Sequence, residues 1–259
     1  MTQLIHPTAV VHPEAKLAAG VELGPYAVIG PKVTIGEGTT VGPHAVIEGR
    51  TTIGKRNKIF QFASVGAAPQ DLKYAGEDTA LEIGDGNTIR EFTTLHVGTQ
   101  GGGGLTKIGN GNLFMAYSHV AHDCVIGNGC ILANSAALAG HVQVEDHVIF
   151  GGLSAVHQFT RIGRHAFVAG GAMVAMDVPP YCTAQGDRAE LVGLNTVGLS
   201  RHGYTEDQIR RIKDAYKILF RSKLGLNEAM SKLRAEHGGH PEIEVMLDFV
   251  ARSERGLTR

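Results

Sequence analysis

The feature that most constrains this chain is a repeat of six residues. A branched apolar residue or phenylalanine recurs at every sixth position in three runs, from Ile5 to Val65, from Ile83 to Leu95 and from Ile108 to Val174. With 43% hydrophobic residues, the eleven in-step positions of the first run would arise by chance about once in ten thousand sequences. A helix repeats about every 3.6 residues and a two-sided strand about every two, so neither explains this period. The repeat predicts a mainly β chain, folded as a parallel β-helix of hexapeptide rungs.

Each rung is expected to be a short strand followed by a turn, and three rungs make one triangular coil. The in-phase apolar side chain points inward and stacks on its counterpart one coil later. Glycine often follows it, as in Ile29-Gly30 and Ile35-Gly36, because a corner needs unusual backbone angles and little bulk. One coil cannot bury its own apolar face, so the stack shares a single core. The in-phase residues make about nine coils, a prism about 40 Å long.

Two interruptions break the repeat, one near residues 66–80 and one near 97–106. Asp71 and Glu77 take the in-phase positions of the first, and neither could face an apolar core unpaired. The second contains four consecutive glycines at 101–104. A flexible loop is favoured there over a phosphate-cradling loop, because the segment lacks the Lys-Ser/Thr ending of a P-loop. Loops that leave a regular scaffold often carry binding groups.

The repeat gives way to a different pattern near the C-terminus. We expect the prism to end near residues 177–180, because the two prolines there cannot continue a hydrogen-bonded ladder. We therefore expect a β-helix domain over residues 1–190 and a small helical domain over 191–259. We expect three helices in the second domain. The first follows a capping box at Thr205 and has apolar residues at helical spacing from Ile209 to Phe220, the second covers 227–235, and the third starts near Pro241, which suits a first helical position.

Composition narrows the function classes. A formal charge of −1 argues against non-specific nucleic-acid binding. The sequence shows no signal peptide or membrane span, so we expect a soluble, cytoplasmic protein. The three cysteines form no CxxC pair and are expected to be small core or corner residues, not a disulfide. Basic residues of the helical part are either solvated faces or a dock for an acidic partner: Arg201, Arg210, Arg211, Lys213, Lys217, Arg221 and Lys223.

Four histidines are spaced close to multiples of one coil, which predicts a column of imidazoles along one edge. They are His96, His122, His141 and His157. One interpretation is structural stacking; a second is a zinc site, as in the hexapeptide prisms of γ-class carbonic anhydrases, although the spacing differs from that class. The third is a general base, with His122 oriented by Asp123. We favour the base, without metal or covalent intermediate, because no nucleophile-elbow motif is present.

Several segments together resemble one family, the acyl-carrier-protein-dependent UDP-N-acetylglucosamine O-acyltransferases of lipid A synthesis in Gram-negative bacteria. The resemblance extends over essentially the whole chain. It is carried by QDLKYAGE (70–77), HVAHDC (119–124), ILANSAALAGHV (131–142), AVHQF (155–159), DVPPY (177–181) and ARSERGLTR (251–259).

This resemblance implies a left-handed β-helix that forms a homotrimer, with active sites between neighbouring prisms. It also implies the first reaction of lipid A synthesis. An (R)-3-hydroxyacyl group moves from the phosphopantetheine thioester of acyl carrier protein to the glucosamine 3-hydroxyl of UDP-N-acetylglucosamine. No cofactor is then needed, since the carrier protein holds the acyl donor. An acidic carrier protein would also suit the basic helical surface.

Residue by residue, the resemblance assigns roles. His122 corresponds to the general base, Asp123 to its orienting carboxylate and the backbone N–H of Gly140 to the oxyanion donor. The remaining matches concern substrate binding: Asp71 and Lys73 near the sugar, His119, His141, His157 and Gln158 in the nucleotide-sugar and acyl site, and Asn195 and Arg201 at the uridine diphosphate, where the arginine fork suits a diphosphate.

Gly170 corresponds to the floor of the acyl tunnel, and a glycine there leaves the tunnel deep. We therefore expect an acyl chain of about fourteen carbons, with bulky Met173 nearby. The chain departs from the family pattern at Val97, Val197 and His202. These departures weaken the expected grip on the nucleotide. They leave open an amine acceptor, a UDP 3-amino-glucosamine analogue that would be N-acylated at the same site.

Overall fold

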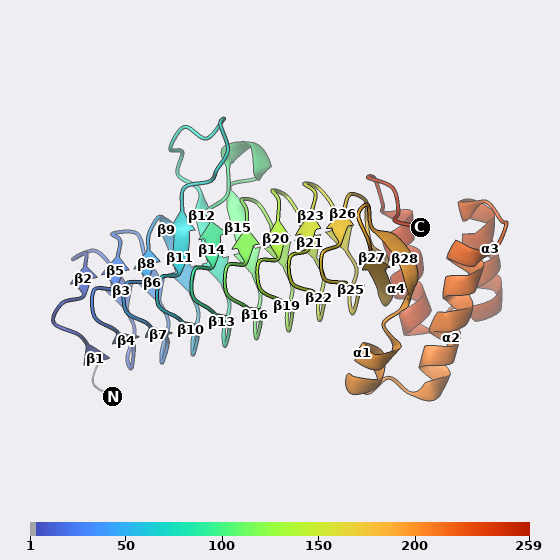
Figure 1. The fold of residues 1–259 in the computed structure, drawn as a ribbon, viewed down its shortest axis with the longest axis horizontal. Coiled ribbons are helices and arrows are strands. Elements are labelled where there is room, and N and C mark those ends of the chain that lie inside the picture. The colour runs from blue at the N-terminus through green and yellow to red at the C-terminus, as the bar shows by residue number, and fades with distance from the viewer. Residues whose placement is uncertain (1–3) are drawn as a thin grey trace.

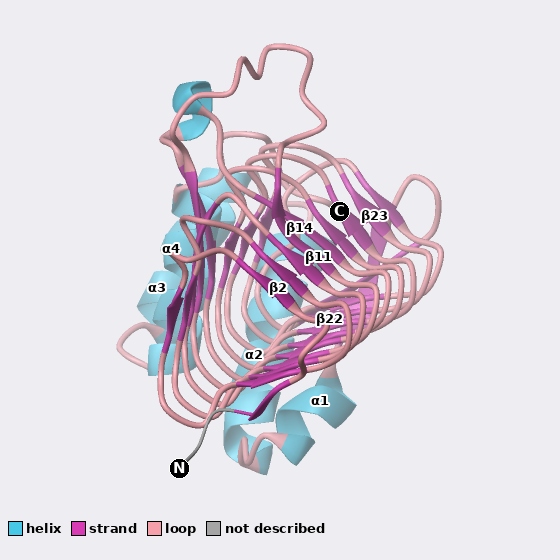
Figure 2. Ribbon diagram, turned by 90° about the vertical axis from the view of Figure 1, so that its left-hand side faces the viewer, coloured by secondary structure: helices cyan, strands magenta, loops and turns pink. Residues whose placement is uncertain are grey.

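The protein is a long three-sided prism with helices at its C-terminal end. The computed structural model describes residues 4–259. Its coils form the left-handed parallel β-helix that the sequence predicts (Figure 1). Viewed along the prism, the strands gather into three sheets that meet at three edges (Figure 2).

We number the sheets by the strand of the first coil that each contains. Sheet 1 consists of β1 (Leu4–Ile5), β4 (Glu22–Leu23), β7 (Thr40–Val41), β10 (Lys58–Ile59), β13 (Thr88–Ile89), β16 (Leu113–Phe114), β19 (Ile131–Leu132), β22 (Ile149–Phe150), β25 (Phe167–Val168), β27 (Cys182–Gln185) and β28 (Glu190–Leu194). Sheet 2 consists of β2 (Val10–Val11), β5 (Val28–Ile29), β8 (Val46–Ile47), β11 (Ser64–Ala67), β14 (Thr94–His96), β17 (His119–Val120), β20 (Ala137–Leu138), β23 (Ala155–Val156) and β26 (Met173–Val174). Sheet 3 consists of β3 (Lys16–Leu17), β6 (Thr34–Ile35), β9 (Arg50–Ile53), β12 (Ala80–Ile83), β15 (Leu105–Ile108), β18 (Val125–Ile126), β21 (Gln143–Val144) and β24 (Arg161–Ile162).

The core consists of the in-phase residues of the repeat. Leu132 pairs with Phe114 on one side and Phe150 on the other, and all three side chains are fully buried. The sequence pattern is misleading only at the N-terminal coil, where Ile5 is 39% exposed. Among the strands of residues 4–259, β1 pairs with β4 alone, so Ile5 is covered on one side only.

The strands are joined at corners that define three edges, named 1/2, 2/3 and 3/1 after the sheets they join. Most corners contain a residue with positive φ, and many of these residues are not glycine. On edge 2/3 they include Asp123 (φ 60°), His141 (φ 63°) and Phe159 (φ 63°). Successive coils therefore place side chains above one another along each edge.

The two prolines do not end the stack, so that expectation is wrong. β27 follows them and pairs in parallel with β25, and β28 returns antiparallel to β27. Pro179 and Pro180 lie in the turn before β27. A ladder requires N–H donors from its strands and not from this turn, so the prolines are tolerated.

Four α-helices and one short π-helix follow the last strand, and two of the α-helices begin at signals read from the sequence. Thr205 and Gln208 form the expected capping box, and Pro241 occupies a first-turn position. The bounds are α1 (Thr196–Arg201), α2 (Glu206–Tyr216), the π-helix η2 (Lys217–Arg221), α3 (Leu226–His237) and α4 (Pro241–Ala251). α1 was not expected from the sequence. The division into domains at residues 190 and 191 stays a prediction.

The helices pack around a second apolar cluster that includes Ile212, Leu233 and Leu247. Tyr216 instead belongs to the core cluster of the prism. All three cysteines are free and buried, as expected. Within residues 4–259, no helix combines the length and apolar character needed to cross a bilayer.

Candidate active site

Both interruptions of the repeat leave the prism at edge 2/3. The first loop joins β11 of sheet 2 to β12 of sheet 3, and the second joins β14 to β15. The loops project together from one side of the prism (Figure 1). The corner residues Asp123, His141 and Phe159 lie on this same edge. The fold thus gathers the loops and the histidine-rich corner in one place.

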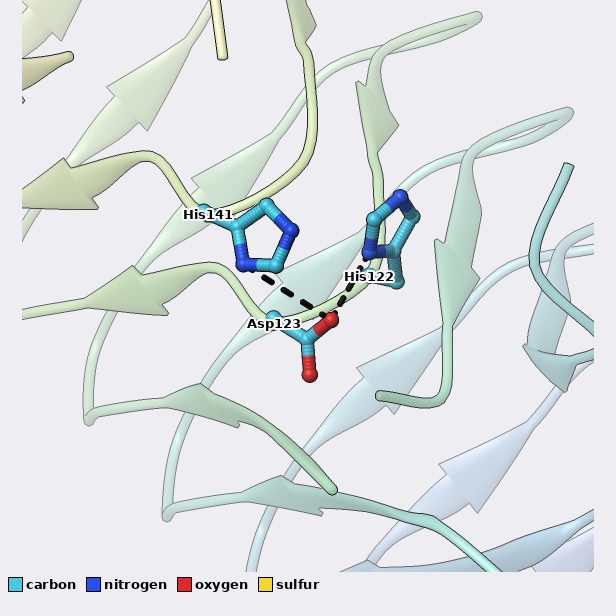
Figure 3. Close-up of side chains that lie close together, drawn as sticks. All are labelled: His122, Asp123 and His141. Atoms are coloured by element: carbon cyan, nitrogen blue, oxygen red, sulfur yellow. Dashed lines mark hydrogen bonds and ion pairs between the residues drawn. The ribbon is translucent and has the colours of Figure 1, made fainter. Parts of the chain in front are cut away.

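His122 and Asp123 form a hydrogen-bonded pair. The Nδ1 atom of His122 lies 2.8 Å from Oδ2 of Asp123 (Figure 3). The Asp123 side chain is 1% exposed and that of His122 is 15% exposed. A carboxylate only accepts, so Nδ1–H donates and Nε2 is left as the basic nitrogen. The sequence predicted this pair, and the geometry is that of an oriented general base.

Two threonines hold Asp123 in place. The backbone N–H and the hydroxyl of Thr99 donate to its two carboxylate oxygens, at 2.9 and 2.6 Å. Its own N–H donates to the hydroxyl of Thr106 at 2.8 Å. Sequence reasoning missed both threonines and treated their segment as a flexible loop. The loop contains a short 3-10 turn, η1 (Gln100–Gly102), and packs against Asp123.

His141 comes from the next coil and faces the same carboxylate. Its Nδ1 lies 3.8 Å from Asp123 Oδ2, its ring meets that of His122 edge-on with centroids 5.0 Å apart, and it stacks on Phe159 at 4.3 Å. Burial is the largest influence on His141 and lowers its pKa, although the Asp123 charge opposes this. A neutral imidazole at this position is therefore favoured near neutral pH.

The same three side chains are the one group in residues 4–259 whose possible metal-ligand atoms all lie within 4.8 Å of one another. However, the carboxylate oxygens of Asp123 already accept hydrogen bonds from Thr99 and His122. A metal would have to displace these donors. The geometry therefore favours a hydrogen-bonded base over the zinc site considered from the sequence.

Gly140 lies directly beside the His122 ring. A Cβ atom on Gly140 would lie 2.5 Å from Cε1 and 2.7 Å from Nε2 of His122, closer than such atoms can approach. Among the backbone hydrogen bonds of residues 4–259, none uses the Gly140 N–H as donor. The structure thus brings an unpaired N–H and the free imidazole nitrogen together.

The four histidines do not form the single column that their spacing suggested. His96 instead packs edge-on against His119, with centroids 4.9 Å apart. Burial lowers the pKa of His96 to about 4, and burial followed by the His122 charge lowers that of His119. The exposed His157 ring lies against Arg255, with 2.7 Å between Nδ1 and Nη2. His157 follows His141 by sixteen residues, whereas a coil contains three rungs of six. An offset of one or two residues changes the direction in which a side chain leaves the corner, so His157 does not point toward His141.

Several predicted substrate residues border the same edge. Asp71 and Lys73 of the first loop line a cavity together with His141 and Phe159. The Asp71 charge also acts to raise the His141 pKa, although burial outweighs it. Gln158 lies in the adjoining corner and is exposed. These residues thus border the edge that carries the His122–Asp123 pair.

Asn195 and Arg201 lie elsewhere in the chain, on edge 3/1. The Asn195 side chain caps α1, accepting from the Gly198 N–H at 3.0 Å, and donates to the His165 carbonyl at 3.0 Å. Arg201 is exposed at the end of α1. His202 packs against His165, with centroids 4.8 Å apart. Within one chain the predicted site residues are thus divided between two edges.

The residues predicted to set acyl-chain length lie at a third location, along sheet 2 toward edge 1/2. A Cβ on Gly170 would come no closer than 3.3 Å to another atom, the Gly152 oxygen. Met173 is 39% exposed. Of the departures from the family pattern, Val97 is buried and Val197 is 61% exposed.

Part of the basic cluster on the helices is occupied within the chain. Arg211 binds the buried Glu242 at 2.6 Å, and Arg221 donates to the Tyr216 hydroxyl. Arg210 and Lys217 form exposed ion pairs with acidic residues one turn away. In the described chain this leaves three members without an ion pair or side-chain hydrogen bond, Arg201, Lys213 and Lys223. The case for an acidic partner therefore rests on fewer charges than the sequence suggested.

Comparison with known proteins decides the family. A family model described as UDP N-acetylglucosamine O-acyltransferase, domain 2, matches residues 177–258, and one for bacterial transferase hexapeptide repeats matches 105–140. The chain is 69% identical over 255 residues to the acyl-(acyl-carrier-protein)–UDP-N-acetylglucosamine O-acyltransferase of Myxococcus xanthus, covering 98% of this chain and 99% of the relative. This chain belongs to the UDP-N-acetylglucosamine O-acyltransferase family.

Solved structures of family members share the whole fold. LpxA from Acinetobacter baumannii superposes with a TM-score of 0.96 at 46% identity, covering 99% of this chain and all of that one. LpxA from Bacteroides fragilis, a UDP-N-acetylglucosamine acyltransferase, gives 0.96 at 42% identity with the same coverage. The resemblance read from the sequence is therefore confirmed for the family and for the fold.

Proposed function

We propose that this acyltransferase moves an (R)-3-hydroxyacyl group from acyl carrier protein to the glucosamine 3-hydroxyl of UDP-N-acetylglucosamine, the first step of lipid A biosynthesis. The observation that carries the proposal is the His122–Asp123 pair beside the free N–H of Gly140. It occurs in a chain 69% identical to a relative named for this reaction. The cytoplasmic location expected from the sequence stays a prediction.

The geometry supports direct transfer. Nε2 of His122 takes the proton of the acceptor hydroxyl, and the oxygen attacks the thioester carbonyl carbon. The Gly140 N–H donates to the carbonyl oxygen as it becomes negative, and Asp123 stabilises the imidazolium. This attack forms the ester C–O bond. Collapse of the tetrahedral intermediate then re-forms the carbonyl and breaks the C–S bond, and the imidazolium returns the proton to the departing thiolate. The chemistry needs no metal and no covalent enzyme intermediate.

The two outer faces next to edge 1/2 favour a homotrimer. This edge bears a ladder of stacked, exposed rings with centroids 4.9 to 5.4 Å apart, formed by Tyr26, His44, Phe62, Phe92 and Tyr117. The outward positions of sheet 1 are apolar in the later coils, namely Leu113, Ile131, Ile149 and Phe167. The corresponding outward positions of sheet 3 are mostly polar, namely Lys107, Val125, Gln143 and Arg161.

Placing edge 1/2 on a three-fold axis would pack sheet 1 of one copy against sheet 2 of the next. Edge 2/3 of one copy would then lie beside edge 3/1 of its neighbour. The dyad at His122 would thereby meet Asn195 and Arg201 of another copy, and the divided site would be completed. With this closed cyclic symmetry, sheet 1 and sheet 2 of every copy are covered by a neighbouring copy.

We therefore expect light scattering to give three times the mass of one chain. Phe62→Asp should break the assembly, because it places a charge within the aromatic ladder. The matched control is Val125→Asp, which changes a 45% exposed valine on sheet 3 and should leave the mass unchanged. A monomeric wild type, or a variant pair that behaves alike, would contradict this arrangement.

Acyl-chain length provides a test of both the reaction and the tunnel. Wild-type protein should transfer an acyl chain of about fourteen carbons, while Gly170→Met should favour the ten-carbon donor. Four methylenes at about 0.8 kcal/mol each correspond to a change in preference of about 200-fold. The assay offers ten-, twelve- and fourteen-carbon carrier-protein donors with a 3-hydroxyl and a 3-amino acceptor. A variant that loses all donors equally would refute the tunnel, and a wild type inactive with every pair would refute the function and call for metal analysis.

A further inference from the structure

We propose that Thr99, in the loop that precedes the glycine run, is a positioning residue that fixes the Asp123 carboxylate and through it the His122 imidazole. The inference deepens the proposed function, because it concerns the base of that reaction. It also gives a role to a loop that sequence reasoning left without one.

The first argument is the completeness of the grip on the carboxylate. Thr99 is 6% exposed, and it alone donates to both oxygens of Asp123, through its N–H to Oδ1 at 2.9 Å and through its hydroxyl to Oδ2 at 2.6 Å. His122 Nδ1 lies 2.8 Å from the same Oδ2. A carboxylate held at both oxygens cannot rotate about its terminal bond. The direction in which it receives the imidazole N–H is therefore set by Thr99.

The glycines beside Thr99 provide the second argument. A Cβ on Gly102 would overlap the Asp123 carboxylate, and one on Gly98 would overlap the backbone of Gly104 and Leu105 and lie 2.7 Å from Oδ1. In contrast, a Cβ on Gly101 would meet no atom within 4 Å. Gly102 thus lets the loop backbone approach the carboxylate directly, and Gly98 lets the two ends of the loop approach each other. The steric requirement at Gly102 comes from Asp123, and the adjacent Gly101 has none.

The third argument is that the loop is anchored at both ends. The Gly98 N–H donates to the Ala80 carbonyl at 3.0 Å, and the Ala80 N–H donates to the Gly104 carbonyl at 2.8 Å. Within the loop, the Gly104 N–H donates to the Thr99 carbonyl at 2.8 Å. These bonds tie the segment to β12. Thr99 is therefore held by the scaffold and can transmit a fixed geometry to Asp123.

Thr99→Val keeps the shape and the N–H of the residue but removes the hydroxyl donor. We expect kcat to fall about 10- to 100-fold, as for the loss of a hydrogen bond to a charged group, with little change in KM for either substrate. Thr99→Ser should restore kcat to within a few-fold of wild type. Gly102→Ala should lower kcat strongly, whereas Gly101→Ala, the same change one residue away, should not.

A spectroscopic measurement separates positioning from general damage. Histidine ¹⁵N shifts should show His122 protonated at Nδ1 in the wild type and a mixture of tautomers in Thr99→Val, with melting temperatures recorded for every variant. A Thr99→Val protein with wild-type kcat and tautomer would overturn the inference, as would a serine variant as impaired as the valine one. If the wild type turns over no substrate, the proposed function fails, while the tautomer measurement still tests the positioning role.

Discussion

Replacing His122 with alanine should lower kcat by about 10²- to 10⁴-fold, the usual contribution of a positioned general base. The neighbouring His141 offers a matched comparison, because its Nδ1 faces the same carboxylate oxygen at 3.8 Å instead of 2.8 Å. Only His122 is within hydrogen-bond distance of Asp123 and is oriented by it. His141→Ala should therefore cost much less in kcat and act mainly on KM.

The comparison is made with purified protein, carrier-protein donor and nucleotide-sugar acceptor, measuring kcat and KM for both variants. Binding of the nucleotide sugar, measured by calorimetry, should survive in His122→Ala, since the imidazole acts on the reacting hydroxyl. If His141→Ala loses as much kcat as His122→Ala or more, the assignment of the base is wrong. In that case the closer hydrogen bond would have only a structural role.

The fold was predictable because the period of six corresponds directly to its rungs. Each in-phase residue, such as Leu132 or Phe150, meets an identical environment in every coil, so local pattern and global packing agree. Prediction failed where a coil lacks that environment. Ile5 lies in a strand paired with β4 on one side only, and Pro180 lies in the turn before β27, outside the paired strands.

The candidate site was predictable only in part. His122 and Asp123 adjoin in sequence, and one coil plus one residue carries His141 onto them. His157 failed because a small offset at a corner redirects the side chain, here toward Arg255. Thr99 was missed because it reaches Asp123 from a loop inserted between coils, and an insertion removes the regular spacing on which the prediction depended.

The resemblance supplied roles that spacing could not. It named Gly140 and Asn195, whose residue types alone carry no catalytic signal. It could not show that Asn195 lies on a different edge from the dyad, because the resemblance gives positions in the sequence and not in space. That separation is the reason for our proposal that a second copy of the chain completes the site.

Gly140→Ala should be nearly as damaging as loss of the base, although it adds only one methyl group. The new Cβ would lie 2.5 Å from Cε1 and 2.7 Å from Nε2 of His122, so the imidazole must move or the Gly140 backbone must shift. Either movement separates the basic nitrogen from the N–H that stabilises the oxyanion. Loss of one oxyanion donor alone typically costs about 10²- to 10³-fold in kcat.

Gly30→Ala is the control for the Gly140 variant. A Cβ on Gly30 would have its closest contact at 3.2 Å, and Ala121 and Ala139 already occupy the equivalent place in later coils. This variant should keep wild-type kcat and melting temperature. Gly140→Ala should keep the melting temperature within a few degrees, because the core beneath the corner is unchanged, while kcat falls about 10²-fold or more. An active Gly140→Ala protein would show that neither the His122 position nor the Gly140 N–H governs the rate, and the proposed mechanism would fail at its central step.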